Sequence, residues 1–262
     1  MSESDQMEHA VVLVDFDNVY HNERTLEEKN WLARALQVLE QSVMNISESV
    51  HHIEIRLYGG WLQNGNYTRR ASKLLGEVGR VTRYPVPHPF ASGLLRGSIE
   101  LPITLVSLPA ITWANTFYVR TGLPRLRIDM ESLPDTCSST HRARCPALTL
   151  RRFTRKRTQL CPVEGCTLSN SAVFRVNQQK MVDTLMACDL MHYSLEGKVR
   201  IIMVVTNDLD LLPAIAMSAS YPNTTGDRVI CLAGTSTSEF SDYRDQLDDI
   251  GVRTINLRSA II

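Results

Sequence analysis

The chain has 262 residues, 44% of them hydrophobic, and its 28 basic residues balance 28 acidic ones. This composition is ordinary for a soluble globular protein of one large domain, or one domain with a sizeable insertion, and the zero net charge argues neither for nor against a polyanionic partner. The polar start, without a secretory leader, and the shortness of every apolar run predict a cytoplasmic protein that does not span a membrane, in which the six cysteines are thiols or metal ligands rather than disulfides.

The first part of the chain alternates predicted strands and helices. An unbroken apolar run within residues 9–20, ending in acids and an asparagine, is typical of a central parallel strand buried on both faces. Thr25 and Glu28 form a capping box for the helix that follows. Three further elements are then predicted: a strand over 52–58, a helix over 67–78 and a strand from residue 79. This order predicts an α/β fold with a Rossmann-like, doubly wound, mostly parallel sheet flanked by helices.

Residues 87–171 depart from this rhythm. They hold eight of the eleven prolines, four of the six cysteines and a dense basic run. We interpret them as an insertion, with an antiparallel hairpin over 98–130 followed by a cysteine-bearing lobe. The core then consists of residues 1–86 and 172–262.

The alternating rhythm returns at residue 177. The apolar run over 199–205 is the clearest buried strand of the chain. The complete set of predicted elements here is a helix over 177–195, a strand over 199–205, a helix over 210–219, a strand over 228–233, a helix over 239–249 and a strand over 252–257.

Acidic residues follow two of the predicted strands. Asp15 and Asp17 end the first strand, and Asp208 and Asp210 follow the strand over 199–205. Ligands of parallel α/β sheets bind beyond the carboxyl ends of the strands, so we expect these carboxylates to converge if the strands are neighbours. Such a cluster is costly unless a cation neutralises it, and Mg²⁺ or Mn²⁺ prefers such oxygen ligands. The alternative is that each acid only caps a helix or turn.

A helix between these strands carries further charge. Lys180 and Asp183 lie on neighbouring turns, so the lysine can shield the acid or reach a phosphate. Taken alone, the pair is typical of a solvated helix face. Between two acidic strand ends, it is expected to form the third wall of the site.

Three motifs in this order resemble a known family. The segments VLVDFDNV, KMVDTLMACD and VVTNDLDLLPAI, with RLYGGW after the second strand, are similar to the NYN domain of the PIN-like ribonuclease superfamily. The resemblance covers residues 10–80 and 175–257. It implies a PIN-like core, and in a nuclease of this type a homo-oligomer is a further expectation.

The resemblance also implies roles for residues of this chain. Asp15, Asp183, Asp208 and Asp210 would bind Mg²⁺ or Mn²⁺, and Asn18 would orient a phosphate or a metal-bound water. The implied activity is that of a ribonuclease, an endoribonuclease by expectation, in which metal ions activate water for phosphodiester hydrolysis. Asp17 departs from the family pattern, and its role stays open. Asp189 matches a second acid that the family often has on this helix, and its position nearly two turns beyond Asp183 implies a supporting role.

The cysteines of the insertion follow the pattern C-x3-H-x3-C-x15-C-x4-C. Zinc takes four Cys or His ligands, often in pairs two to four residues apart. Spacing alone therefore predicts a structural zinc site with Cys137, Cys145, Cys161 and Cys166, or with His141 in place of one cysteine, whereas scattered thiols are the alternative. The other two cysteines lie on apolar segments and are expected in the core: Cys188 and Cys231.

A basic run lies inside the same lobe. Seven positive charges fall within sixteen residues of a chain that has no net charge. Such a patch attracts nucleic-acid phosphates without reading sequence, although many such runs are only solvated surface. The predicted RNA-binding residues, beside Lys180, are Arg151, Arg152, Arg155, Lys156 and Arg157.

Two other functions compete with the ribonuclease. The spacing of Asp15, Asp17 and Val19 resembles the D-x-D-x-(T/V) motif of haloacid-dehalogenase-type phosphatases, which form an aspartyl-phosphate. The later acids do not follow that family's spacing, and its Ser/Thr and Lys motifs are not evident. The non-enzymatic alternative is an RNA-binding module of the same fold that has lost catalysis.

Overall fold

The computed structural model describes residues 8–20, 30–81, 85, 95–121, 149–150, 153–154, 159–161, 164–170, 175–179, 181–222, 228–235 and 240–257. The chain divides into two compact units. The first comprises Met1–Thr116 and Gln179–Ile262, and the second comprises Phe117–Gln178.

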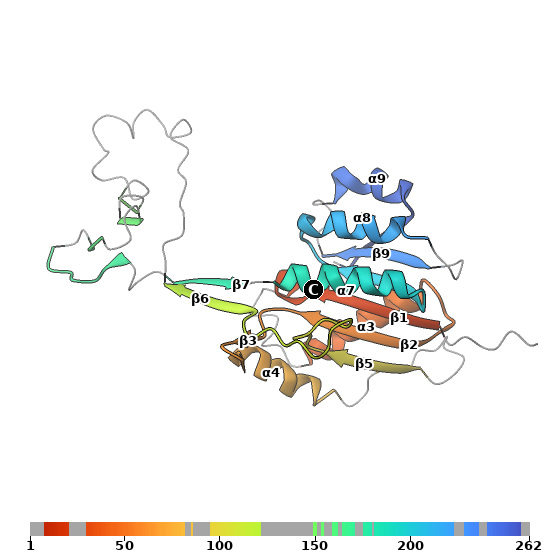
Figure 1. Ribbon diagram of the computed structural model, residues 1–262, viewed down its shortest axis with the longest axis horizontal. Helices are drawn as coiled ribbons and strands as arrows, with labels where there is room; N and C mark the ends of the chain where they lie inside the picture. Colours follow the sequence, from red (N-terminus) through yellow and green to blue (C-terminus); the bar gives the residue numbers. More distant parts are fainter. Residues whose placement is uncertain are drawn as a thin grey trace, which may run out of the picture. The chain divides into compact units, whose positions relative to one another are not determined.

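The first unit is built on a parallel sheet of six strands (Figure 1). From β1, the chain adds strands in one direction through β2 to β5, and then returns to add β8, β9 and β10 on the other side of β1. The reversal lies between β1 and β8, the point where parallel α/β sheets bind ligands. In spatial order the strands are β10 (Val252–Asn256), β9 (Val229–Gly234), β8 (Val199–Val205), β1 (Glu8–Asp15), β2 (Val50–Tyr58) and β5 (Arg96–Glu100).

The two central strands are apolar because helices cover both of their faces. On β1, Ala10, Val12 and Val14 point to one layer of the core, while Val11 and Leu13 point to the other. All five are fully buried. Continuous apolar runs of this kind are characteristic of parallel strands covered on both sides.

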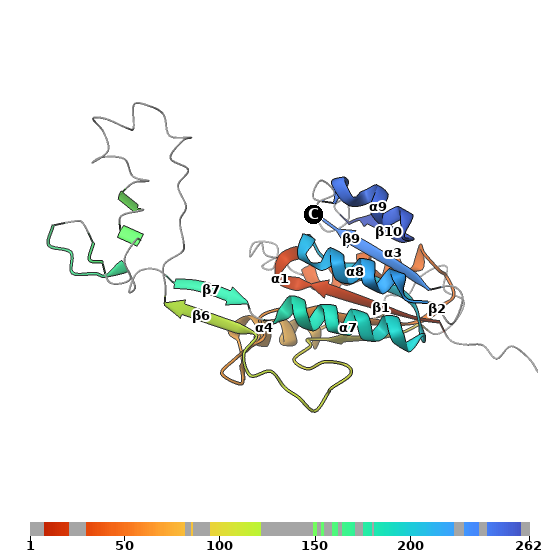
Figure 2. The same cartoon turned by 45° about the horizontal axis from the view of Figure 1, so that its top comes forward.

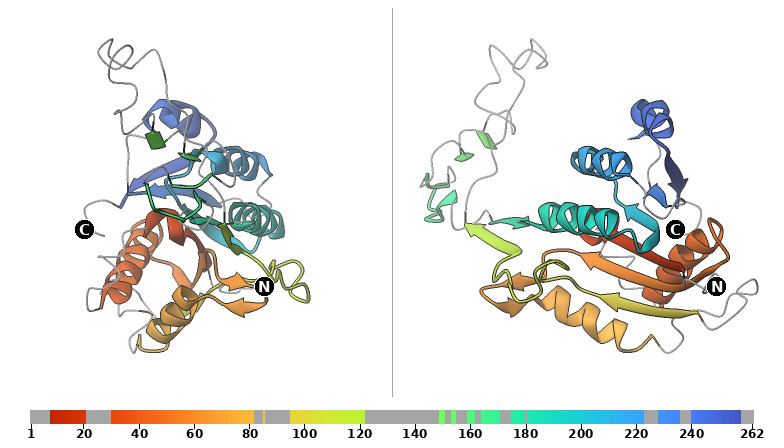
Figure 3. Two further views of the ribbon diagram at one scale, coloured as in Figure 1. Left: turned by 90° about the vertical axis from the view of Figure 1, so that its left-hand side faces the viewer. Right: turned by 45° about the vertical axis from the view of Figure 1, so that its right-hand side comes forward.

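Helices cover both faces of the sheet, as Figure 3 shows from the end and Figure 2 shows for the α7 side. The face of Ala10 packs against α1 (Phe16–Val19), α3 (Trp31–Met44) and α4 (Arg69–Val78). The face of Val11 packs against α7 (Val182–Glu196), α8 (Leu212–Ser220) and α9 (Arg244–Asp249). Short 3-10 turns precede the last two helices: η2 (Leu209–Leu211) and η3 (Ser241–Tyr243). Among the described helices, none is long and apolar enough to cross a membrane.

The fold confirms the predicted α/β class and corrects several elements. The third strand of the sheet is β5 rather than a strand at residue 79, because Gly79 ends α4. Residues 96–100 therefore belong to the main sheet and not to an antiparallel hairpin over 98–130. The helix predicted from 177 begins at Val182, because residues 175–179 form β7. Thr25 and Glu28 lie outside the described residues.

Two small sheets complete the described structure. β3 (Leu62–Gln63) and β4 (Asn66–Tyr67) form a short antiparallel hairpin directly after β2. β6 (Phe117–Thr121) pairs with β7 (Arg175–Gln179). The other predicted strands and helices of the first unit are confirmed within a few residues of their predicted ends.

Candidate metal centre

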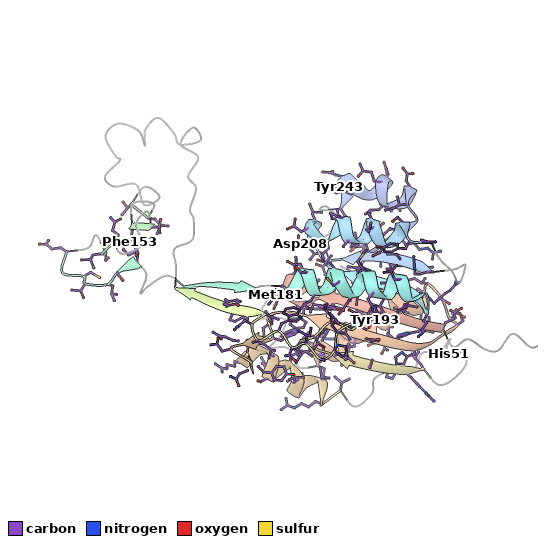
Figure 4. All side chains as sticks on the ribbon, in the orientation of Figure 1. His51, Phe153, Met181, Tyr193, Asp208 and Tyr243 are labelled. Atoms are coloured by element: carbon purple, nitrogen blue, oxygen red, sulfur yellow. The ribbon has the colours of Figure 1, made fainter. Side chains whose placement is uncertain are left out.

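Three aspartates converge at the carboxyl ends of the two central strands. Asp15 is the last residue of β1, Asp208 follows β8 by three residues, and Asp183 lies in the first turn of α7. One carboxylate oxygen from each lies within 4.8 Å of the others. Figure 4 labels Asp208, and Met181 just before α7, at this edge of the sheet. We call these three residues the acidic triad.

Asp15 is the buried member of the triad, with 3% of its surface exposed. The Thr206 hydroxyl donates to one carboxylate oxygen at 3.0 Å, and the Asn18 backbone N–H donates to the other at 3.3 Å. Burial raises the pKa of Asp15 to about 6; the Thr206 hydrogen bond opposes this rise and the Asp183 charge adds to it. The carboxylate is therefore held in place without a basic partner at either of these bonds.

Asp208 both caps a turn and belongs to the triad. Its carboxylate accepts the Asp210 N–H at 2.9 Å and so caps η2, as the capping alternative predicts. Its own N–H donates to the Thr206 hydroxyl oxygen at 2.9 Å. Thr206 thus links Asp15 to Asp208, and capping and convergence occur together rather than excluding one another.

The loop that carries Asp208 is tied to the end of β9. The Asn207 side chain accepts the Thr235 N–H at 2.9 Å and donates to the Thr235 hydroxyl at 2.8 Å. Gly234 allows this approach, since a Cβ there would lie 3.1 Å from the Asn207 side-chain oxygen and 3.2 Å from the Thr206 carbonyl oxygen. Thr206 and Asn207 were not among the predicted site residues, although the strand-end sequence Thr-Asn-Asp is the signal that marks them.

Asp183 is the most exposed member of the triad. Desolvation by the surrounding protein raises its pKa, and the charges of Asp208 and Asp210 add to the rise. Asp210 itself is exposed and lies outside the group of three, so of the four predicted metal ligands the structure brings three together. Its influence on Asp183 is electrostatic.

Asp17 has a different role from its neighbour Asp15. Its carboxylate accepts the Gly60 N–H at 2.8 Å and forms an ion pair with Arg70. These contacts join the end of β1 to the end of β2. The predicted site residue Asn18 lies beside them, half-buried, and its described contact with the triad is the backbone N–H bond to Asp15.

Asp189 lies in a separate buried network. It is fully buried and accepts the Tyr58 hydroxyl at 2.7 Å, the Arg56 guanidinium at 3.3 Å and the Val106 N–H at 2.8 Å. These contacts fasten the segment after β5 to α7. The prediction that Asp189 supports the triad is therefore not borne out by a direct contact, although Tyr58 is the strand partner of Asp15.

The described residues include two of the predicted zinc ligands and none of the predicted RNA-binding cations. Cys161 and Cys166 are half-buried free thiols in a turn closed by the Cys161 N–H to Leu168 carbonyl bond of 2.8 Å. Cys231 is buried as predicted, whereas Cys188 is exposed, so its predicted place in the core is wrong. The other predicted zinc ligands and the predicted RNA-binding cations lie outside the described residues: Cys137, His141, Cys145, Arg151, Arg152, Arg155, Lys156, Arg157 and Lys180.

The acidic triad fits a divalent cation by its donor chemistry. Mg²⁺ binds oxygen ligands at about 2.1 Å in an octahedron, so ligands on opposite sides lie about 4.2 Å apart, and it keeps several waters. Three carboxylate oxygens within 4.8 Å of one another, one of them on an exposed residue, match that demand. Asp15, Asp183 and Asp208 could therefore hold a hydrated Mg²⁺ or Mn²⁺ ion.

Comparison of the chain with protein-family models, with curated proteins and with solved structures found no significant match. The geometry of the acidic triad is therefore the structural observation that bears on function.

Proposed function

We propose that this protein is a metal-dependent ribonuclease of PIN-like type that hydrolyses RNA phosphodiester bonds at the acidic triad. The observation that carries the proposal is the convergence of Asp15, Asp183 and Asp208 at the reversal point of a parallel sheet. The choice of RNA as substrate, and of endonucleolytic cleavage, comes from the motif resemblance.

The triad would hold the metal, and the chain around it would keep the ligands in place. Bound Mg²⁺ or Mn²⁺ supplies activation of a water and stabilisation of charge on the phosphate oxygens. Thr206 fixes the orientation of Asp15 and of the Asp208 backbone. Asp183 leaves the site open to solvent, which an extended polymer substrate requires.

The environment of Asp17 favours this reaction over phosphoryl transfer through an aspartyl-phosphate. Here the Asp17 side chain is only 7% exposed and is committed to Arg70 and to the Gly60 N–H. Both oxygens of this carboxylate are thus engaged by the protein itself, which leaves Asp17 poorly placed to act on a substrate.

The insertion supplies the remaining parts of the proposal. Cys137, Cys145, Cys161 and Cys166, or His141 for one of them, would hold a structural zinc ion. The basic run of the same lobe, with Lys180, would hold the RNA backbone. All four acids that the resemblance assigns to the metal are present in the sequence, which favours catalysis over a module that only binds RNA.

The test is cleavage of end-labelled single-stranded RNA by the full chain with Mn²⁺ or Mg²⁺. Asp208→Asn keeps an oxygen for the Asp210 N–H but removes a charged ligand, so we expect cleavage to fall at least about 100-fold. EDTA should abolish it, while Asp249→Asn, at an exposed position on α9, should cleave like the wild type. Cleavage that survives both EDTA and Asp208→Asn would contradict the proposal, and RNA binding without cleavage would favour the non-catalytic module.

A further inference from the structure

A cationic surface lies beside the acidic triad. It comprises four residues of β4 and the first turns of α4, namely Tyr67, Arg69, Arg70 and Lys73, and we call it the α4 surface. Arg69 and Lys73 are exposed, Tyr67 is 46% exposed, and Arg70 is half-buried. Figure 1 shows β3 and the start of α4 at the edge of the sheet where β1 and β2 end. This is the edge that carries Asp15.

Contacts connect the α4 surface to Asp17, close to the triad in the chain. Arg70 forms an ion pair with Asp17, two residues from Asp15, and the Gly60 N–H donates to the same carboxylate at 2.8 Å. Asp17 is close enough to Asp15 for its charge to raise the pKa of that carboxyl. A polymer phosphate at the triad therefore has Arg70 as a neighbouring cation.

The positive charges of the α4 surface lie at positions where they destabilise the helix. Arg69 and Arg70 occupy the first two positions of α4, where the helix dipole favours acids. Arg69 and Lys73 are four residues apart, a spacing at which like charges repel. The acid on this side of the helix, Glu77, pairs with Arg80 at 3.0 Å, and within the described ranges neither Arg69 nor Lys73 forms an ion pair. A bound polyanion would remove both penalties.

Arg70 is fixed in place with donors left over. Its guanidinium donates to Asp17 and to the Tyr20 carbonyl oxygen, and it stacks 5.0 Å from the centre of the Phe16 ring. A guanidinium has five N–H donors, so these two bonds leave Nη hydrogens for another acceptor. With its side chain 40% exposed, Arg70 can reach a phosphate at little cost in side-chain entropy.

Tyr67 is presented by a rigid hairpin. Asn64 and Gly65 turn the hairpin with positive φ values of 51° and 76°. The Gly65 N–H donates to the Ala114 carbonyl oxygen at 2.8 Å, and the Asn64 N–H donates to the Asn115 side chain at 2.6 Å. An exposed aromatic ring beside cations is the arrangement on which unpaired bases stack.

We propose that the α4 surface binds a single-stranded nucleic acid, with Arg69, Arg70 and Lys73 on successive phosphates and Tyr67 against an unpaired base. The inference rests on the proposed function in one respect, namely that the bound nucleic acid continues into the triad. The binding itself does not require catalysis. It gives the first unit its own substrate-binding surface, independent of the basic run in the second.

The test measures binding of a labelled oligouridylate of about twelve nucleotides to the full chain by fluorescence anisotropy, in EDTA so that no cleavage occurs. Arg69→Ala with Lys73→Ala should raise Kd about tenfold and reduce the slope of log K against log salt by about 1.4, the value for two lost phosphate contacts. The matched control is Lys198→Ala with Arg253→Ala, which removes equal charge from exposed positions just before β8 and on β10 and should change Kd less than about twofold. Tyr67→Ala should weaken binding about tenfold, whereas Tyr67→Phe should retain it.

The outcomes separate this inference from the proposed nuclease. Weaker binding by the α4 variants in a protein that cleaves nothing would support the surface and contradict the nuclease. Metal-dependent cleavage with unchanged Kd and salt slope in the α4 variants would overturn the surface and leave the nuclease. Equal binding of duplex RNA, insensitive to Tyr67→Ala, would overturn the single-stranded substrate class, and no binding by the wild type would overturn the surface altogether.

Discussion

Asp183 and Asp189 lie on the same helix, but their carboxylates belong to two regions that differ in burial and in hydrogen-bond and ion-pair partners. Asp189 is fully buried and is matched by the Arg56 guanidinium, the Tyr58 hydroxyl and the Val106 N–H. Asp183 is exposed and converges on two other acids, and the three of them share no basic partner in the described structure. The contrast suggests that the first region contributes stability and that the second keeps negative charge free for a cation.

The buried network should give the largest effect on stability. Asp189→Ala leaves the buried Tyr58 hydroxyl proton and the Val106 N–H without their acceptor. It also removes one of the three carboxylates around Arg56, which keeps its ion pairs with Glu54 and Glu100. We expect it to lower the free energy of unfolding by about 2–4 kcal/mol, since each buried donor left without a partner costs about 1–3 kcal/mol, as measured by urea denaturation. Asp183→Ala is the matched control on the same helix and should change stability by no more than about 0.5 kcal/mol. Equal losses for the two variants would remove the distinction between the regions.

The triad should give the largest effect on the response to metal. In the wild type, Mn²⁺ at about 100 times its Kd should raise the free energy of unfolding by about 2.7 kcal/mol. Asp208→Asn should lose most of this gain, because it removes one of three ligands, and Asp210→Asn should keep most of it, because Asp210 lies outside the group. The measurement is the shift of Tm with Mn²⁺ concentration. A loss for Asp210→Asn as large as for Asp208→Asn would restore the four-ligand site that the sequence predicts.

The sequence is informative about the triad because its signals are local. Continuous apolar runs identify β1 and β8, and acids directly after each run mark the site edge. By contrast, β5 was misassigned, since its sequence RGSIE has one large apolar residue and only a partly buried edge position. An edge strand of this kind lacks the apolar pattern that separates a strand from a loop.

Long-range pairings had no comparable signal. Arg70 and Asp17 are separated by 53 positions, and Arg56 and Asp189 by 133. A charged residue that is buried with its partner looks the same in sequence as one that is solvated. For that reason the family resemblance predicts that Asp189 supports the triad, whereas its partners in the structure come from β2 and the segment after β5.

Thr206 should have an intermediate effect on both stability and metal binding. Thr206→Val removes the hydroxyl that donates to Asp15 and accepts the Asp208 N–H. We expect a loss of about 1–3 kcal/mol in stability and a weakening of Mn²⁺ binding by about tenfold or more, measured by denaturation and by calorimetry. Thr206→Ser retains the hydroxyl and should restore most of the Mn²⁺ affinity. Wild-type affinity in Thr206→Val would mean that the triad is positioned by other contacts.

Cys231 provides the test with the smallest expected effect. It shows how an ionisable group behaves when it is buried and no described residue forms an ion pair or hydrogen bond with it. It is fully buried on β9, and burial raises the pKa of its thiol to about 12, so it stays neutral in the folded protein. Cys188 is exposed on the α7 helix and serves as the internal control. At pH 8 we expect iodoacetamide to alkylate Cys188 in the native protein and Cys231 only after denaturation, as peptide mass spectrometry would resolve. Rapid native labelling of Cys231 would mean that the sheet opens near β9. The strand ends that carry the triad would then be less firmly held than the structure indicates.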